Sequence, residues 1–234
     1  IFSVTGSDGI LPFLIAGGAI LCAAIPIFLA RNESPDLGEG SEHHFLRYIL
    51  LVPTATVAAF VFGAVEAGGL SLFPIYATRE GFTETQAALL LTVMGVGNMV
   101  FQIPLGMISD RMHDRRPLLA AMAVVGLIGA LCLPLLSVSW VLMAITLLFW
   151  GGSVSGLYTI GLTHLGSRLK GSDLANANAA FVFCYAMGTV GGPQGIGAAM
   201  DVSGNHGFAW AIAGFFALYV LVSLGRLLFR PKQT

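Results

Sequence analysis

The chain has 234 residues, of which 56% are hydrophobic and only 10% are charged, and its formal net charge at pH 7 is −1. Soluble domains carry charged side chains at about 25% of positions, because they need a polar surface against water. Such a low charged fraction excludes an ordinary soluble domain and predicts an integral membrane protein whose surface contacts lipid. The near-zero net charge gives no electrostatic reason to expect a nucleic-acid partner.

The sequence carries no motif for catalysis or for a cofactor. Its cysteines, Cys22, Cys132 and Cys184, are widely spaced within apolar runs, a pattern that fits neither a disulfide framework nor a zinc site. A phosphate-binding loop and a nucleophile elbow are both absent. We therefore expect no enzyme activity, no cofactor and no metal. Because the first residue is Ile1 rather than methionine, we also expect the chain to be a fragment whose natural N-terminus is missing.

Seven stretches are long and apolar enough to cross a bilayer, for which a helix needs about 20 residues. The polar breaks between them are short, except for the acidic, glycine-containing linker at 31–44. Short turns make consecutive helices antiparallel. The sequence therefore predicts an all-α integral membrane bundle of seven transmembrane helices. The stretches run approximately over 10–30, 48–77, 85–108, 117–136, 138–165, 174–200 and 207–229.

The positions of the basic residues predict how the bundle is oriented. If the linker after the first stretch lies in the cytoplasm, every lysine and arginine except Arg79 falls on the cytoplasmic side. The positive-inside rule predicts this bias. We therefore expect a multi-pass protein of the cell inner (plasma) membrane, with its N-terminus outside and its C-terminus in the cytoplasm.

The stretch 48–77 contains an acidic residue, Glu66, among small and apolar neighbours. A carboxylate inside a bilayer costs a few kcal/mol unless it is paired or takes up a proton, and the neighbouring stretches contain no lysine or arginine. Two interpretations stay open. Glu66 is either a proton-coupling or substrate-binding carboxylate that faces a central cavity, or a protonated structural acid near the outer interface.

Other polar residues within the stretches are weaker candidates for substrate or proton binding. Asn98 and Gln102 lie four residues apart on 85–108, so they share one helix face. Tyr158 lies on 138–165, and Tyr185 lies in the middle of 174–200. For each of these residues, packing between helices is the alternative to ligand contact.

Glycine is concentrated in the stretch 174–200, which includes Gly188, Gly192 and Pro193. Small residues allow membrane helices to approach closely, and a proline removes one backbone hydrogen bond and favours a kink. These residues are expected to serve helix packing, with a role in gating as the second interpretation.

A charged turn follows the stretch 85–108 and contains Asp110, Arg111, Arg115 and Arg116. Its aspartate could cap a neighbouring helix, and its arginines could bridge carboxylates or lipid phosphates. Such a cluster could hold two helices in one arrangement and release them in another. The alternative is an ordinary positive-inside turn.

The pattern Gly106-x-x-x-Asp110-Arg111-x-x-x-Arg115-Arg116 resembles the signature loop of the major facilitator superfamily. That family's pattern is Gly-x-x-x-Asp-Arg-x-Gly-Arg-Lys/Arg, between the second and third helix of each six-helix half. In this chain His113 and Asp114 stand where the family usually has one glycine, so the turn is one residue longer.

The resemblance implies the C-terminal portion of a bacterial permease-like secondary transporter. Residues 1–30 would form the last helix of the N-terminal half, 31–47 the central cytoplasmic loop, and 48–234 the C-terminal six-helix half. The expected partners are a small-molecule substrate, protons, membrane lipid and the missing N-terminal helices. In the family, the signature aspartate of one half faces the fifth helix of the other, so the partner of Asp110 would lie outside this chain.

Two other classes of function are compatible with parts of the sequence. A non-transporting sensor or lipid-handling protein could share the same fold, because fold alone does not determine function. A seven-helix receptor or retinal protein would match the number of stretches. However, a retinal Schiff base needs a lysine in the last helix, and 207–229 has none.

Overall fold

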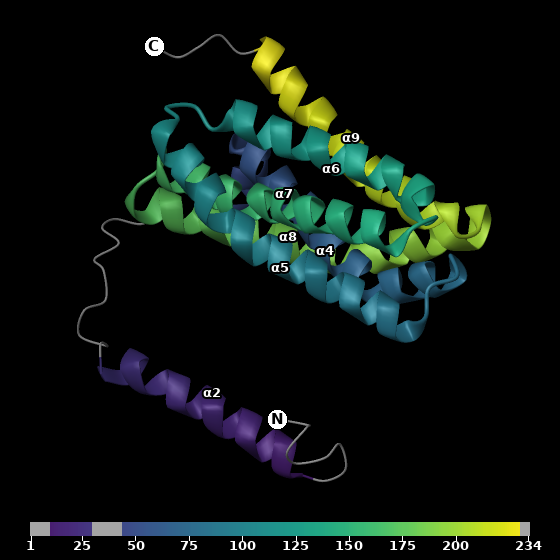
Figure 1. Ribbon diagram of the computed structural model, residues 1–234. Coiled ribbons are helices and arrows are strands. Elements are labelled where there is room, and N and C mark those ends of the chain that lie inside the picture. The colour runs from purple at the N-terminus through teal and green to yellow at the C-terminus, as the bar shows by residue number, and fades with distance from the viewer. Residues whose placement is uncertain (1–9, 30–43, 230–234) are drawn as a thin grey trace. The chain divides into compact units, whose positions relative to one another are not determined.

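The computed structural model describes residues 10–29 and 44–229, and these residues are helical apart from short turns (Figure 1). The chain separates into two compact units, Ile1–Glu39 and Gly40–Thr234. The first contains helix α2 (Leu11–Leu29), which includes Pro26. The helices of the second unit are α3 (Phe45–Leu51), α4 (Pro53–Arg79), α5 (Glu84–Arg111), α6 (Arg116–Leu136), α7 (Trp140–Gly166), α8 (Gly171–Ser203) and α9 (His206–Phe229).

The predicted all-helical fold is confirmed, and within the described residues 5 helices are long and apolar enough to cross a membrane. They are α4, α5, α6, α7 and α9. The helix α8 has 33 residues, which is ample length, but its glycines and polar residues such as Gln194 lower its hydropathy. That α2 and α8 also cross the membrane therefore stays a prediction.

One predicted boundary is wrong, because residues 48–51 do not belong to the same helix as residues 53–77. The backbone breaks at Val52, where φ is −123° and ψ is 49°, and α4 begins at Pro53. A proline disfavours helical geometry in the residue before it, and it is well suited to the first position of a new helix. Residues 45–51 form the separate short helix α3.

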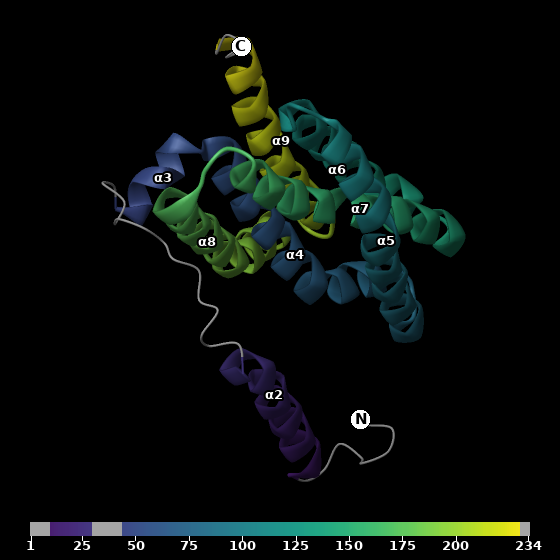
Figure 2. The same ribbon diagram turned by 90° about the vertical axis from the view of Figure 1, so that its left-hand side faces the viewer.

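Helices that are distant in the sequence form the main packing pairs of the second unit: α4 with α8, α5 with α7, and α6 with α9 (Figure 2). The turns between consecutive helices are short, so α4, α6 and α8 begin at one end of the bundle, and α5, α7 and α9 end there. We call this end the basic end. Of the described lysines and arginines, only Arg79 lies at the opposite end.

The contact between α4 and α8 depends on glycine. A side chain at Gly188 would collide with the backbone of α4 at Phe60 and Ala64, and one at Gly192 would collide with Ala64. From the opposite side, a side chain at Gly63 would collide with the carbonyl of Tyr185. The two backbones are therefore in direct contact, and α8 continues as one helix through Pro193.

Candidate functional site

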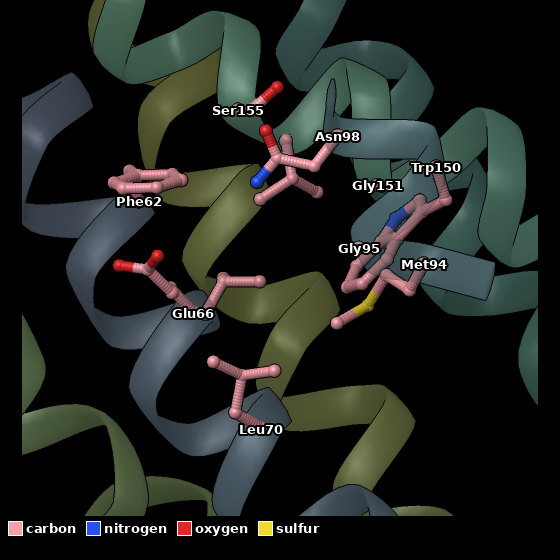
Figure 3. Close-up of a pocket in the computed structure, with 11 residues that line it drawn as sticks. Phe62, Glu66, Leu70, Met94, Gly95, Asn98, Trp150, Gly151 and Ser155 are labelled. Carbon is pink, nitrogen blue, oxygen red and sulfur yellow. The ribbon is translucent and has the colours of Figure 1, made fainter. Parts of the chain in front are cut away.

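A pocket of about 170 Å³ lies between α4, α5 and α7 (Figure 3). Phe62 and Glu66 line it from α4, and they lie opposite side chains of α5 and α7. The α5 side contributes Met94 and Asn98, and the α7 side contributes Trp150 and Ser155. The lining is mainly apolar with a few polar groups, which is the usual make-up of a small-molecule site.

The carboxylate of Glu66 is held by a tyrosine from α8. The hydroxyl of Tyr185 donates a hydrogen bond of 2.8 Å to Oε2 of Glu66. The ring of Tyr185 stacks on Phe62, with 5.9 Å between ring centroids and an interplanar angle of 21°. Glu66 is half-buried, and no ion pair within the described residues includes it. An acid held by a hydroxyl rather than by a cation can exchange a proton without breaking a salt bridge.

Tyr158 supports this arrangement from α7 without lining the pocket. Its ring lies 5.2 Å from that of Phe62 and 5.5 Å from that of Tyr185, measured between centroids. Phe181 packs edge-on against Tyr158 at 5.0 Å. The aromatic rings therefore fix the position of the Tyr185 hydroxyl. Neither tyrosine lines the pocket itself.

Asn98 and Gln102 occupy one face of α5, as their spacing predicts, but only Asn98 lines the pocket. The side-chain amide of Gln102 donates a hydrogen bond of 2.8 Å to Oδ1 of Asn98. This bond occupies the carbonyl oxygen of the Asn98 side chain. The NH₂ group of Asn98 has no hydrogen-bond partner in the described part of the chain. The pocket thus combines one carboxylate with one amide donor.

Of the residues that line the pocket, only Glu66 and Asn98 were predicted from the sequence as site residues. Phe62 and Met94 each lie four residues before a predicted polar residue, so helical spacing could have identified them. Trp150 and Ser155 reach the pocket only through the packing of α7 against α5. The indole of Trp150 donates a hydrogen bond of 2.9 Å to the carbonyl of Gly126 on α6, so its ring forms a fixed wall.

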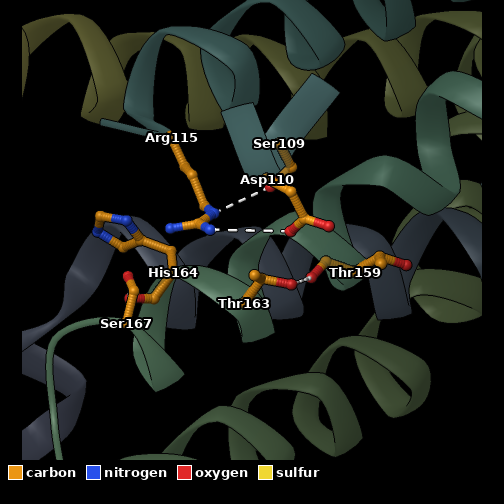
Figure 4. Close-up of polar contacts among 7 residues, drawn as sticks. All are labelled: Ser109, Asp110, Arg115, Thr159, Thr163, His164 and Ser167. Atoms are coloured by element: carbon orange, nitrogen blue, oxygen red, sulfur yellow. Dashed lines mark hydrogen bonds and ion pairs between the residues drawn. The ribbon is translucent and has the colours of Figure 1, made fainter. Parts of the chain in front are cut away.

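Within the described residues, the hydrogen bonds and ion pairs of the charged turn at the end of α5 join its residues to one another and to Ser109 (Figure 4). The Nε of Arg115 donates a hydrogen bond of 2.9 Å to Oγ of Ser109, and its Nη2 lies 4.0 Å from the Asp110 carboxylate. The side chain of Asp110 is 77% exposed. Most of this carboxylate is therefore available to another group.

The extra residue of the turn also has a partner. The carboxylate of Asp114 lies 3.3 Å from Nε of Arg116 and accepts a hydrogen bond of 3.1 Å from the Arg116 backbone N–H.

Arg111 is exposed, and no other atom lies within 4 Å of where a side chain at Gly106 would begin. Nothing in the described residues therefore requires glycine at position 106.

Comparison with known proteins agrees with the arrangement of helices. The family model described as Major Facilitator Superfamily matches residues 55–234. The uncharacterized MFS-type transporter YfkF of Bacillus subtilis (strain 168) is 28% identical over 191 residues, covering 78% of this chain and 48% of YfkF. Monocarboxylate transporter 12 of Xenopus laevis is 25% identical over 198 residues, covering 82% of this chain and 42% of the relative.

A third relative, the uncharacterized MFS-type transporter Ent638_1421 of Enterobacter sp. (strain 638), is 24% identical over 221 residues, covering 92% of this chain and 55% of the relative. The chain thus spans about half the length of the curated relatives it matches. The family match runs from the first turn of α4 to the last residue. The chain therefore belongs to the Major Facilitator Superfamily, a family of multi-pass membrane transporters and not of enzymes.

Proposed function

We propose that this chain is the C-terminal portion of a secondary active transporter that moves a small molecule by alternating access, coupled to protons. Residues 48–234 would form the C-terminal six-helix half, 31–47 the central cytoplasmic loop, and 1–30 the last helix of the N-terminal half. Substrate would bind near the middle of the membrane between the two halves. The C-terminus would lie in the cytoplasm of a bacterial cell, with the basic end of the bundle on that side.

The observation that carries this proposal is the position of Glu66. It lies 13 residues after the first residue of α4, which places it about 20 Å along a helix that is about 40 Å long. The carboxylate is therefore near the middle of the helix, where it lines the pocket and has no cationic partner among the described residues. A carboxylate at such a depth favours binding either a proton or a cationic substrate.

The chemistry of the pocket supports coupling to protons. An ionised Glu66 would repel an anionic substrate through a medium of low dielectric constant, whereas a protonated Glu66 would not. If the substrate is an anion, proton uptake by Glu66 would therefore come before substrate binding, and the two would move together. If the substrate is a cation, the two would compete for the same carboxylate and move in opposite directions.

The test is transport by the full-length gene product in proteoliposomes with a proton gradient across the membrane. Monocarboxylates are the first substrates to examine, because one relative is named a monocarboxylate transporter, and lipophilic cations are the alternative. We expect one class to accumulate against its concentration gradient only while the proton gradient lasts. Accumulation that is unaffected by a proton ionophore would contradict the coupling proposal.

A further inference from the structure

A second cavity lies at the basic end, well away from the Glu66 pocket. It has a volume of about 50 Å³, whereas a single water needs about 10–15 Å³ by the same measure. The space is large enough for a group of several atoms. Its lining includes Val52 and Pro53 at the junction of α3 and α4, Arg116 at the start of α6, Arg168 just after α7, and Arg226 near the end of α9.

The lining of this cavity is strongly cationic. Three arginines and His164 line it. Arg116 is paired with the carboxylate of Asp114, which lies 3.3 Å from its Nε, and Arg226 also has an interaction partner. The side chain of Arg116 is only 16% exposed, and His164 is buried. A partly enclosed space lined by guanidinium groups is a favourable place for an anion, because arginine binds phosphate through paired hydrogen bonds.

The backbone adds to this preference for an anion. Both α4 and α6 begin at the cavity, at Pro53 and Arg116. The helix dipole places partial positive charge at both of these ends. The contribution is that of the dipole, because Pro53 has no N–H group and the N–H of Arg116 already donates to Asp114. Arg168 lies just after the C-terminus of α7, and Arg226 lies in the last turn of α9, where arginine is favourable. Arginine side chains and helix N-termini together are typical of phosphate recognition.

The rim of the cavity is apolar, which indicates where the phosphate would come from. Leu51 lines the cavity and is 44% exposed, and its neighbour Leu50 on α3 is 79% exposed. This exposed leucine surface continues from the cavity along α3 at the ends of the membrane-crossing helices. A phospholipid carries acyl chains next to its phosphate and can contact both the arginines and the leucines, whereas a free phosphate ion gains nothing from the leucines.

We propose that this cavity binds the phosphate group of an anionic phospholipid, with Arg116 and Arg168 contacting the phosphate and α3 contacting the lipid chain. Basic cavities between membrane helices at the cytoplasmic side bind anionic headgroups in other membrane proteins. The site is separate from the Glu66 pocket, and the proposal does not depend on proton coupling.

The test measures lipid binding to the full-length gene product in detergent by native mass spectrometry. The wild type is expected to bind phosphatidylglycerol more tightly than phosphatidylcholine. Arg168→Gln is expected to weaken phosphatidylglycerol binding about tenfold, because it removes a charge-assisted pair of hydrogen bonds. Lys170→Gln removes the same charge two residues away but outside the cavity, so its effect is expected to stay below about twofold.

A conservative variant and a comparison of two lipids on the wild type complete the experiment. Arg168→Lys keeps the charge but loses the planar fork, so its affinity should lie between those of wild type and Arg168→Gln. The wild-type comparison of the two lipids does not depend on any variant folding. Equal affinity for the two lipids, or equal effects of Arg168→Gln and Lys170→Gln, would overturn the proposal. Binding of inorganic phosphate without any preference for phosphatidylglycerol would contradict the assignment to lipid.

Discussion

Replacing Glu66 with glutamine in the full-length gene product is expected to reduce proton-driven accumulation of substrate by about 100-fold or more. That is the scale on which removing a positioned proton-transfer group slows a reaction. Glutamine keeps the size of the side chain and can still accept the hydrogen bond from Tyr185, but it cannot take up a proton at neutral pH. The measurement is uptake of labelled substrate into proteoliposomes with and without a proton gradient.

The same variant should separate coupling from movement. If the substrate is an anion, we expect Glu66→Gln to retain exchange of internal for external substrate. The neutral glutamine does not repel the anion, and the conformational change itself does not require a proton. Glu84→Gln is the matched control, because Glu84 is exposed in the first turn of α5 and does not line the Glu66 pocket. Proton-driven accumulation at the wild-type level in Glu66→Gln would exclude Glu66 as the proton carrier.

Replacing Gly188 with valine is expected to prevent α4 and α8 from packing, and thus to abolish the folded state. Even the single Cβ of Gly188→Ala would overlap the backbone of α4 at Phe60, and a backbone cannot move aside as a flexible side chain can. Overpacking of this kind costs about 1–3 kcal/mol, and the two additional methyl groups of valine add to it. The measurement is the yield of monodisperse protein and its thermal unfolding in detergent.

Gly191 provides the matched control, since it lies on α8 between the two packed glycines and has open space around its Cβ position. Gly191→Ala should change the free energy of unfolding by no more than about 1 kcal/mol, and alanine favours the helix. If Gly188→Ala and Gly191→Ala unfold at the same temperature, the close contact between α4 and α8 is not what stabilises this half.

Hydropathy alone was sufficient to predict the long helices of the second unit but not the short helix α3, because a lipid-facing helix must be apolar along most of its length. It was less informative about α8, because this helix contains several glycines, two of which, Gly188 and Gly192, pack directly against the backbone of α4. The break before α4 was predictable in principle from Pro53, but the apolar residues on both sides of it made 48–77 look continuous.

The candidate site was only partly predictable. Glu66 and Asn98 stand out as polar residues in apolar helices, and Tyr185 was a candidate for the same reason. The bond between Tyr185 and Glu66 joins residues 119 positions apart, so no local pattern could reveal it. Trp150 was not predicted as a pocket residue, because a tryptophan in a membrane helix is as compatible with helix packing as with ligand binding. Its orientation follows from the hydrogen bond to Gly126, which the sequence does not reveal.

Proton-coupled transport through Glu66 requires that the Glu66 pocket be part of a water-accessible path between two halves. A direct measurement is the reaction of Asn98→Cys with a membrane-impermeant thiol reagent, in a full-length gene product whose Cys22, Cys132 and Cys184 are replaced by serine. Val100→Cys is the control, because two residues turn an α-helix by about 200° to another face, and Val100 is exposed but does not line the pocket. We expect Asn98→Cys to react and to be protected by the transported substrate, while Val100→Cys stays unreactive. An Asn98→Cys protein that never reacts, or that reacts equally with and without substrate, would contradict this expectation.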